Sequence, residues 1–278
     1  MITLINIELY KIFKRSRTYI AFAAVFVIVV ALQIGVHFEG QSTLDFLFQN
    51  IKESFMFQGD LVNGYLITFI ILSSLWIHIP ILVSMVTGDM ISGEANGGTF
   101  RLLLTRPISR TKLVIAKFLA GWFYSILLVA FMALISLLPS LLIFGKGDLI
   151  VMKTTINFFS ADDLLWRFIA AFGYGMLTMT TVASLSFMLS SFSDNSIGPI
   201  IGTISIIIAI TIISSVGESL LRPVLPYMFT TYLTSWLLFF EFELNFTKII
   251  QAISVELIYT LIFLTITLIY FRRKDILS

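Results

Sequence analysis

Cysteine is missing from all 278 residues, which excludes disulfide bonds, thiolate nucleophiles and cysteine metal sites. Only two histidines are present, too few for a histidine-rich metal cluster. The phosphate loop G-x-x-x-x-G-K-[ST], the zinc motif H-E-x-x-H and the nucleophile elbow G-x-S-x-G do not occur either. These absences argue against a phosphate-loop ATP site, a cysteine or histidine-rich metal site and a nucleophile elbow, and we expect neither a metal nor a cofactor on this chain.

Charge is also scarce. Charged residues make up 12% of the chain, against about 25% in soluble domains, whereas 58% of the residues are hydrophobic. Such a chain cannot cover a surface that faces water, so the lipid bilayer must be its solvent.

Six apolar runs are long enough to cross a bilayer as helices. They lie at about 19–36, 61–87, 118–144, 164–190, 197–215 and 249–271. The first run lacks a signal-peptide cleavage site after it and is therefore expected to stay as a span. We predict an all-α polytopic membrane protein that forms a single domain over 1–278. The apolar run at 227–240 is too short to span, which predicts a re-entrant or interfacial element over 224–240.

Orientation follows from the basic residues. Twelve of the 18 Lys and Arg residues fall in the N-terminus, in 88–117 and in the C-terminal tail, which six spans place on one side. The positive-inside rule makes that side cytoplasmic.

Residues 1–17 form a candidate amphipathic helix. Ile2, Ile5, Leu9, Ile12 and Phe13 share one face, and the opposite face carries Lys11, Lys14 and Arg15. This pattern predicts a helix on the inner leaflet with its cations near anionic lipid. The alternative is contact with a partner protein.

The predicted spans contain almost no charge: Arg167 and Glu256 are inside, each within about two turns of an outer end. We expect Glu256 to be paired or to reach toward the surface, and His78 to be a neutral, packed residue hydrogen-bonded near a kink at Pro80. The alternative for both residues is contact with a substrate path. An uncharged midplane argues against a secondary transporter.

The stretch 92–118, SGEANGGTFRLLLTRPISRTKLVIAKF, interrupts the apolar runs. Gly97 and Gly98 allow the backbone to turn, because glycine adopts conformations that other residues avoid. Thr99 can then cap a short helix TFRLLL that ends before Pro107. Ser109 is then expected to cap the helix of the third span. The leucine ridge suits a groove on another protein, or a helix lying flat on lipid.

This stretch resembles the signature of ABC-2 type permeases. The matching features are the SGE start, Gly98-Thr99, the leucine run, Arg106-Pro107, Ser109-Arg110 and Lys117. The double glycine and LLLT are also similar to the branch that serves nitrous oxide reductase maturation. In such permeases this run is a coupling helix seated in a cleft of an ATPase. The resemblance assigns ATPase docking to residues 93–104 with Arg106 and Arg110 at the edges, that is to Gly93, Glu94, Gly98, Thr99, Phe100, Arg101, Leu102, Leu103, Leu104, Arg106 and Arg110.

The resemblance implies a non-catalytic permease subunit, expected to be an exporter in the inner (cytoplasmic) membrane. ATP and Mg²⁺ would bind a separate ATPase chain, present in two copies, and the permease would form a homodimer or heterodimer among membrane lipid. No nucleic-acid partner is expected. Two alternatives stay open: a secondary transporter or channel without a nucleotide partner, and a membrane anchor that recruits an ATPase for a mechanical or regulatory task.

Overall fold

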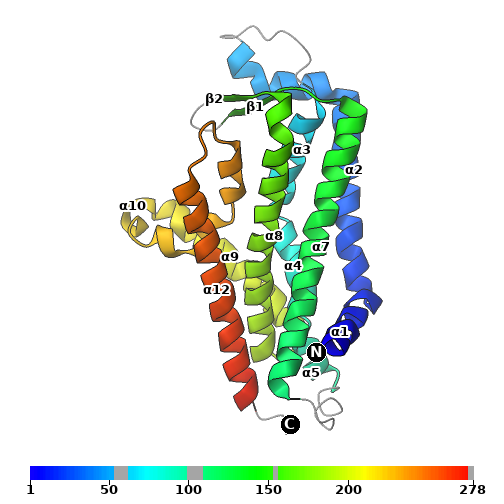
Figure 1. Cartoon of the computed structure of the whole chain (residues 1–278), viewed down its shortest axis with the longest axis vertical. Helices are drawn as coiled ribbons and strands as arrows, with labels where there is room; N and C mark the ends of the chain where they lie inside the picture. The colour runs from blue at the N-terminus through cyan, green and yellow to red at the C-terminus, as the bar shows by residue number, and fades with distance from the viewer. Residues whose placement is uncertain (53–61, 99–108, 153–155, 275–278) are drawn as a thin grey trace.

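A computed structural model describes residues 1–52, 62–98, 109–152 and 156–274. Five long helices dominate it (Figure 1): α2 (Ser16–Lys52), α7 (Arg110–Phe144), α8 (Ala161–Phe192), α9 (Ile197–Val216) and α12 (Phe246–Arg273). Each is long and apolar enough to cross a membrane, α2 through its part Ser16–Gly40. The chain is therefore a mainly helical, multi-pass membrane protein.

The second predicted span is broken into two helices. α3 (Gly64–Leu75) and α4 (Ile79–Thr87) meet at an angle of 52°. We expected the kink at Pro80, but the break precedes it, at residues 76–78, and Pro80 lies in the first turn of α4. Proline fits there because the first turn of a helix needs no partner for its backbone N–H. Counted as one span, the bent pair would be the sixth.

Helix α8 lies at the centre of the bundle and packs against α4, α7, α9 and α12. Hydroxyl side chains allow these close approaches: Ser186 donates to the carbonyl of Ser84, and the Thr181 and Thr260 hydroxyls lie 3.1 Å apart. Small polar residues of this kind let helices pack tightly in a membrane, where burial of apolar surface does not drive association. In contrast, α9 buries little of its surface at the edge of the bundle.

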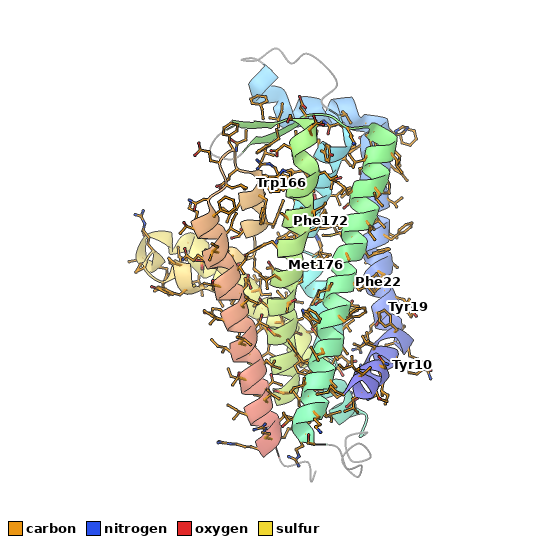
Figure 2. The ribbon with its side chains drawn as sticks, viewed as in Figure 1. Tyr10, Tyr19, Phe22, Trp166, Phe172 and Met176 are labelled. Atoms are coloured by element: carbon orange, nitrogen blue, oxygen red, sulfur yellow. The ribbon has the colours of Figure 1, made fainter. Side chains whose placement is uncertain are left out.

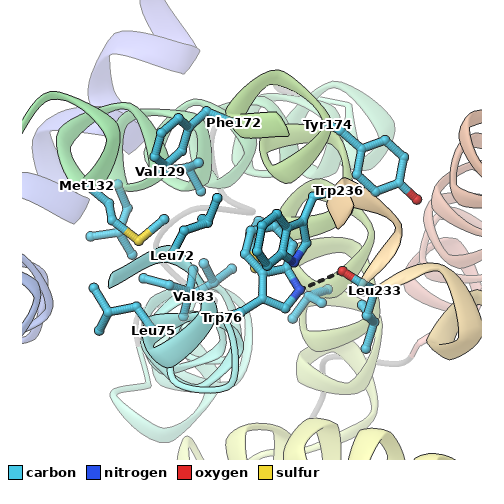
Figure 3. Close-up of a cluster of buried hydrophobic side chains, with 14 of the residues drawn as sticks. Leu72, Leu75, Trp76, Val83, Val129, Met132, Phe172, Tyr174, Leu233 and Trp236 are labelled. Atoms are coloured by element: carbon cyan, nitrogen blue, oxygen red, sulfur yellow. Dashed lines mark hydrogen bonds between the residues drawn. The ribbon is translucent and has the colours of Figure 1, made fainter. Parts of the chain in front are cut away.

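The second half of the segment before α12 is folded into the bundle. The whole segment comprises α10 (Glu218–Leu221), η1 (Leu225–Tyr227), α11 (Phe229–Tyr232) and η2 (Ser235–Phe240). The indole N–H of Trp76, at the break between α3 and α4, donates to the carbonyl of Leu233 at 2.5 Å (Figure 3). The Tyr174 hydroxyl of α8 donates to the carbonyl of Tyr232 at 2.9 Å. Buried Trp236 packs beside Trp76, so α11 and η2 are part of the core, whereas η1 has no buried residue and Leu220 of α10 is 84% exposed.

One feature departs from the all-α prediction. β1 (Leu149–Met152) and β2 (Ile156–Phe159) form an antiparallel pair between α7 and α8. Asn63 ties this pair to the bundle, because its side chain caps α3 and also donates to the carbonyl of Asp148 at 2.8 Å. We call this end of the bundle the top.

The opposite end, which we call the base, consists of α1 (Ile2–Lys14), α5 (Ser92–Asn96), the start of α7 and the end of α12 (Figure 1). Helix α1 and the end of α12 therefore lie at the same end of the molecule. Ser109 caps α7 as predicted, accepting from the backbone N–H of Lys112 at 3.3 Å. Helix α7 begins at Arg110, eight residues before the predicted span. Figure 2 shows Tyr10 and Tyr19 near the base, and both are exposed.

Candidate functional site at the base

The start of the signature stretch is a short helix. Residues Ser92–Asn96 form α5. Its N-terminal end is held by α8, because the backbone N–H groups of Ile91 and Ser92 both donate to the Ser190 hydroxyl, at 3.1 and 2.9 Å. The chain leaves α5 through Gly97 and Gly98. Gly98 has φ +64°, a left-handed conformation that favours glycine.

A buried ion-pair cluster joins α5 to two other helices. Lys117 of α7 lies 2.6 Å from the Glu94 carboxylate of α5 and 2.8 Å from the Glu8 carboxylate of α1. Lys11 of α1 lies 2.7 Å from Glu8 and 2.8 Å from Glu94. Two cations and two carboxylates thus alternate, and Lys117 is only 1% exposed. We call Glu8, Lys11, Glu94 and Lys117 the base cluster.

The charges of the base cluster stabilise one another. Burial alone would raise the pKa of Glu94, but the positive charges of Lys117 and Lys11 and their hydrogen bonds outweigh it and lower the pKa below its usual value. Burial alone would lower the pKa of Lys11, but hydrogen bonds to Glu8 and Glu94 and their negative charges raise it. Glu94 and Lys11 are therefore held in their charged forms.

A second set of ion pairs lies beside the base cluster. Asp89, between α4 and α5, pairs with Arg15, and at 3.3 Å with Arg17. Gly93 makes room for this carboxylate: a Cβ at Gly93 would lie 2.4 Å from the Asp89 side-chain oxygen Oδ1. Gly93, predicted to dock an ATPase, thus faces an internal carboxylate.

The base cluster corrects the prediction for residues 1–17. Helix α1 ends at Lys14, where Arg15 is extended, and its buried residues are Glu8 and Ile12. The predicted apolar face is wrong in part, because Ile2 is exposed and Lys11 turns inward to the two carboxylates. The missed signal was Glu8 itself, which lies between Ile5 and Ile12 on the face we assigned to lipid.

The predicted docking residues separate into three groups. Gly93 and Glu94 lie in α5, and Gly98 lies just after it. Arg110 binds within the chain, since its guanidinium donates to the carbonyls of Arg272 and Lys274 at 3.2 and 2.8 Å. The remaining residues and the predicted helix TFRLLL lie outside the described residues: Thr99, Phe100, Arg101, Leu102, Leu103, Leu104 and Arg106.

His78 and Glu256 lie far from the base, and both differ from expectation. His78 is exposed rather than packed, although its Nδ1 does lie 2.9 Å from the carbonyl oxygen of Ser74, as a hydrogen bond near a kink requires. Glu256 is fully buried against α8. Helix α12 begins at Phe246, so Glu256 lies ten residues, or roughly 15 Å, along it. The expectation of a carboxylate that is paired or reaches toward the surface is wrong, because both carboxyl oxygens are buried without a partner among the described residues.

Among the described residues, no three His, Cys, Asp or Glu side chains come together in a way that could hold a metal ion. The charged side chains at the base form ion pairs between helices. Glu94 connects the signature stretch to α1 through Lys11 and to α7 through Lys117.

Residues 24–277 match the family described as "Protein of unknown function (DUF2705)". The chain belongs to the DUF2705 family. This DUF2705 chain is also 25% identical over 118 residues to "Uncharacterized protein YhcI" of Bacillus subtilis (strain 168). That match covers 40% of the chain and 37% of the length of YhcI, so the two proteins are similar over about a third of the relative.

Proposed function

We propose that the chain is the membrane-spanning subunit of an ATP-driven transporter, and that it exports its substrate. A separate ATPase would dock on residues 93–104, with two ATPases serving a dimer of permeases. The chain would cross the inner membrane six times, with the bent pair α3–α4 counted as one span and the base in the cytoplasm. ATP and Mg²⁺ would bind the partner, and this chain would supply the path.

The observation that carries the proposal is the place of Glu94. It lies in the signature stretch, and its carboxylate binds Lys11 of α1 and Lys117 of α7 at 2.8 and 2.6 Å. A push on residues 93–104 would therefore reach two helices through charge-assisted hydrogen bonds rather than through a loose loop. Buried, paired charges suit this task because separating them is costly.

The α8 contact gives the docking stretch a third connection. Ile91 and Ser92 are bound to Ser190, and α8 packs on most of the other long helices. Movement of α5 would thus act on α1, α7 and α8 together. Such rigid-body transmission is what a passive membrane subunit needs, because the energy of ATP binding arises on another chain.

The test is co-purification of an ATPase with the tagged chain from its native host. We expect a nucleotide-binding ATPase to accompany the wild type and to be lost from Leu103→Asp, while the variant still inserts into membranes. Phe158→Asp is the matched control, because Phe158 is an exposed apolar residue at the opposite end of the molecule. An ATPase that stays bound to Leu103→Asp as well as to wild type would overturn the docking assignment.

A second variant separates docking from transmission. Glu94→Gln keeps the size of the side chain but removes the charge that pairs with Lys11 and Lys117. Because the Glu94 carboxylate is turned inward to Lys11 and Lys117, we expect the other residues of 93–104 to keep the ATPase bound, while most of the coupling between ATP hydrolysis and transport is lost. A membrane anchor that merely recruits an ATPase would show no such change.

One observation favours a second candidate, a secondary transporter. The argument against it was a span interior with almost no charge, yet the carboxyl group of Glu256 is 0% exposed inside the bundle. Ionisable groups buried among membrane-spanning helices are typical of ion and proton pathways. Transport by the purified chain alone in liposomes, without ATP, would support this candidate over the first.

A further inference from the structure

Glu256 is buried without a counter-charge. It is 0% exposed, and neither of its carboxyl oxygens has a hydrogen-bond partner among the described residues. The Thr181 hydroxyl of α8 donates instead to the backbone carbonyl of Glu256 at 3.2 Å and lies 3.1 Å from the Thr260 hydroxyl. An ionised carboxylate in such a place would cost several kcal/mol of desolvation energy.

The groups that face Glu256 cannot neutralise it. Helix α12 packs against α7, α8, α11 and η2. The titratable group that α8 places near Glu256 is Tyr174. The cation of α8, Arg167, is paired with Asp163 at 2.7 Å in the first turns of that helix. Helix η2 contains no titratable side chain. The buried cation of α7, Lys117, is bound to Glu8 and Glu94 at the base.

Glu256 lies at the contact between α12 and α8, which we call the seam. The buried residues of α12 form one stripe, Ile249, Ala252, Glu256, Thr260, Phe263, Thr267 and Phe271, with spacings of three and four residues. Glu256 is thus at a position where a helix normally places a small or apolar side chain. Its burial therefore depends on the contact of α12 with α8.

We propose that Glu256 is a proton-binding site inside the bundle, loaded while α12 packs on α8 and emptied when the two helices separate. In the packed state the carboxyl holds its proton and is uncharged. When the seam opens, water enters, the O–H bond breaks and the proton passes to water, leaving a hydrated carboxylate. Closing the seam reverses the step. The site thus ties the gain or loss of one proton to the position of α12.

This inference does not rest on the proposed ATPase partner. Glu256 lies in α12, ten residues from its top end, whereas the docking stretch lies at the base. A failure to find an ATPase would leave the proton site in place. Loss of the proton site would likewise leave the docking of an ATPase untouched.

The experiment is infrared spectroscopy of the full chain in lipid nanodiscs at neutral pH. We expect a carbonyl band of a protonated carboxylic acid in the wild type and its loss in Glu256→Gln. Glu243→Gln is the control, because Glu243 is exposed near the start of α12 and is expected to leave the band unchanged. If wild type and Glu256→Gln show the same absence of this band, the carboxylate is ionised and the proposal is overturned.

A wedge variant tests the link to the seam. Ala252 is fully buried one turn before Glu256, so Ala252→Phe should push α12 away from α8 and abolish the protonated band at the same pH. Ser254→Phe, on the exposed side of the helix, should keep it. If Ala252→Phe does not fold, raising the pH on wild type provides the second measurement. The proposal then requires the band of Glu256 to persist well above the pH at which exposed carboxyl groups ionise.

Discussion

Lys117 of α7 and Glu94 of α5 form an ion pair with 2.6 Å between the ammonium nitrogen and the carboxylate oxygen, and Lys117 is 1% exposed. Replacing Lys117 with Met removes the charge of a nearly isosteric side chain and leaves two carboxylates with one cation. Breaking a buried pair in this way costs about 3–5 kcal/mol. We expect the free energy of unfolding to fall by about 3 kcal/mol, the lower end of that range. The loss is limited because Lys11 still binds both carboxylates.

The measurement is the thermal midpoint of the detergent-solubilised protein. Lys112→Met is the matched control, since Lys112 is exposed on the same helix, and surface changes of this kind stay within about 0.5 kcal/mol. Equal midpoints for the two variants would show that the base cluster does not hold α1 and α5 to α7.

The base cluster also predicts a pH dependence. The pKa of Glu94 lies below its usual 4.5, so its stabilising contribution is present above that value and is lost as the pH falls through the lowered pKa. The pKa of Lys11 lies above its usual 10.5, so its contribution is present below that value and is lost as the pH rises through the raised pKa. Their joint contribution should thus be constant between 4.5 and 10.5.

Thermal midpoints measured from acid to alkaline pH check this expectation. Glu94→Gln should weaken the acid-side fall relative to wild type. A wild-type curve that rises as the pH drops below 4.5 would contradict the assignment of Glu94 as a stabilising anion.

Gly175 is a place where a methyl group does not fit. A Cβ there would lie 2.8 Å from the Trp76 ring, which is itself held by the carbonyl of Leu233. We expect Gly175→Ala to cost about 1–3 kcal/mol through overpacking and to change the tryptophan fluorescence. Gly173→Ala is a strict control, because nothing lies within 4 Å of its Cβ position. Gly173→Ala should stabilise the helix by up to about 1 kcal/mol. The same change in stability and fluorescence for both variants would refute the close contact between Gly175 and Trp76.

Asn63 is predicted to hold the top of the broken span. Its side-chain oxygen accepts from the N–H groups of Tyr65 and Leu66, and its amide donates to the carbonyl of Asp148. Asn63→Ala should cost about 1–2 kcal/mol through the lost cap alone. Asn63→Asp should recover part of that loss, because it keeps the accepting oxygen. No difference between the two variants in thermal midpoint would mean that the cap contributes little.

Local features of the chain could be predicted because they depend on neighbours in sequence. The membrane character follows from apolar runs, and the cap of α7 follows from Ser109. The bend between α3 and α4 was placed near the correct residue but two to four positions late. The β1–β2 pair was missed, because four-residue strands carry little signal beside long apolar helices.

The sequence alone determined that the chain is a membrane protein. The length and hydropathy of a segment depend only on the residues within it, so they can be read without the tertiary structure. Only the tertiary structure decided which charges meet. Lys11 and Glu94 are separated by 83 positions in the chain, and Glu8 and Lys117 by 109. It also decided that Glu256 is buried at the seam of α12 and α8. A charge is costly or stabilising according to what surrounds it in space, and periodicity along one helix does not contain that information.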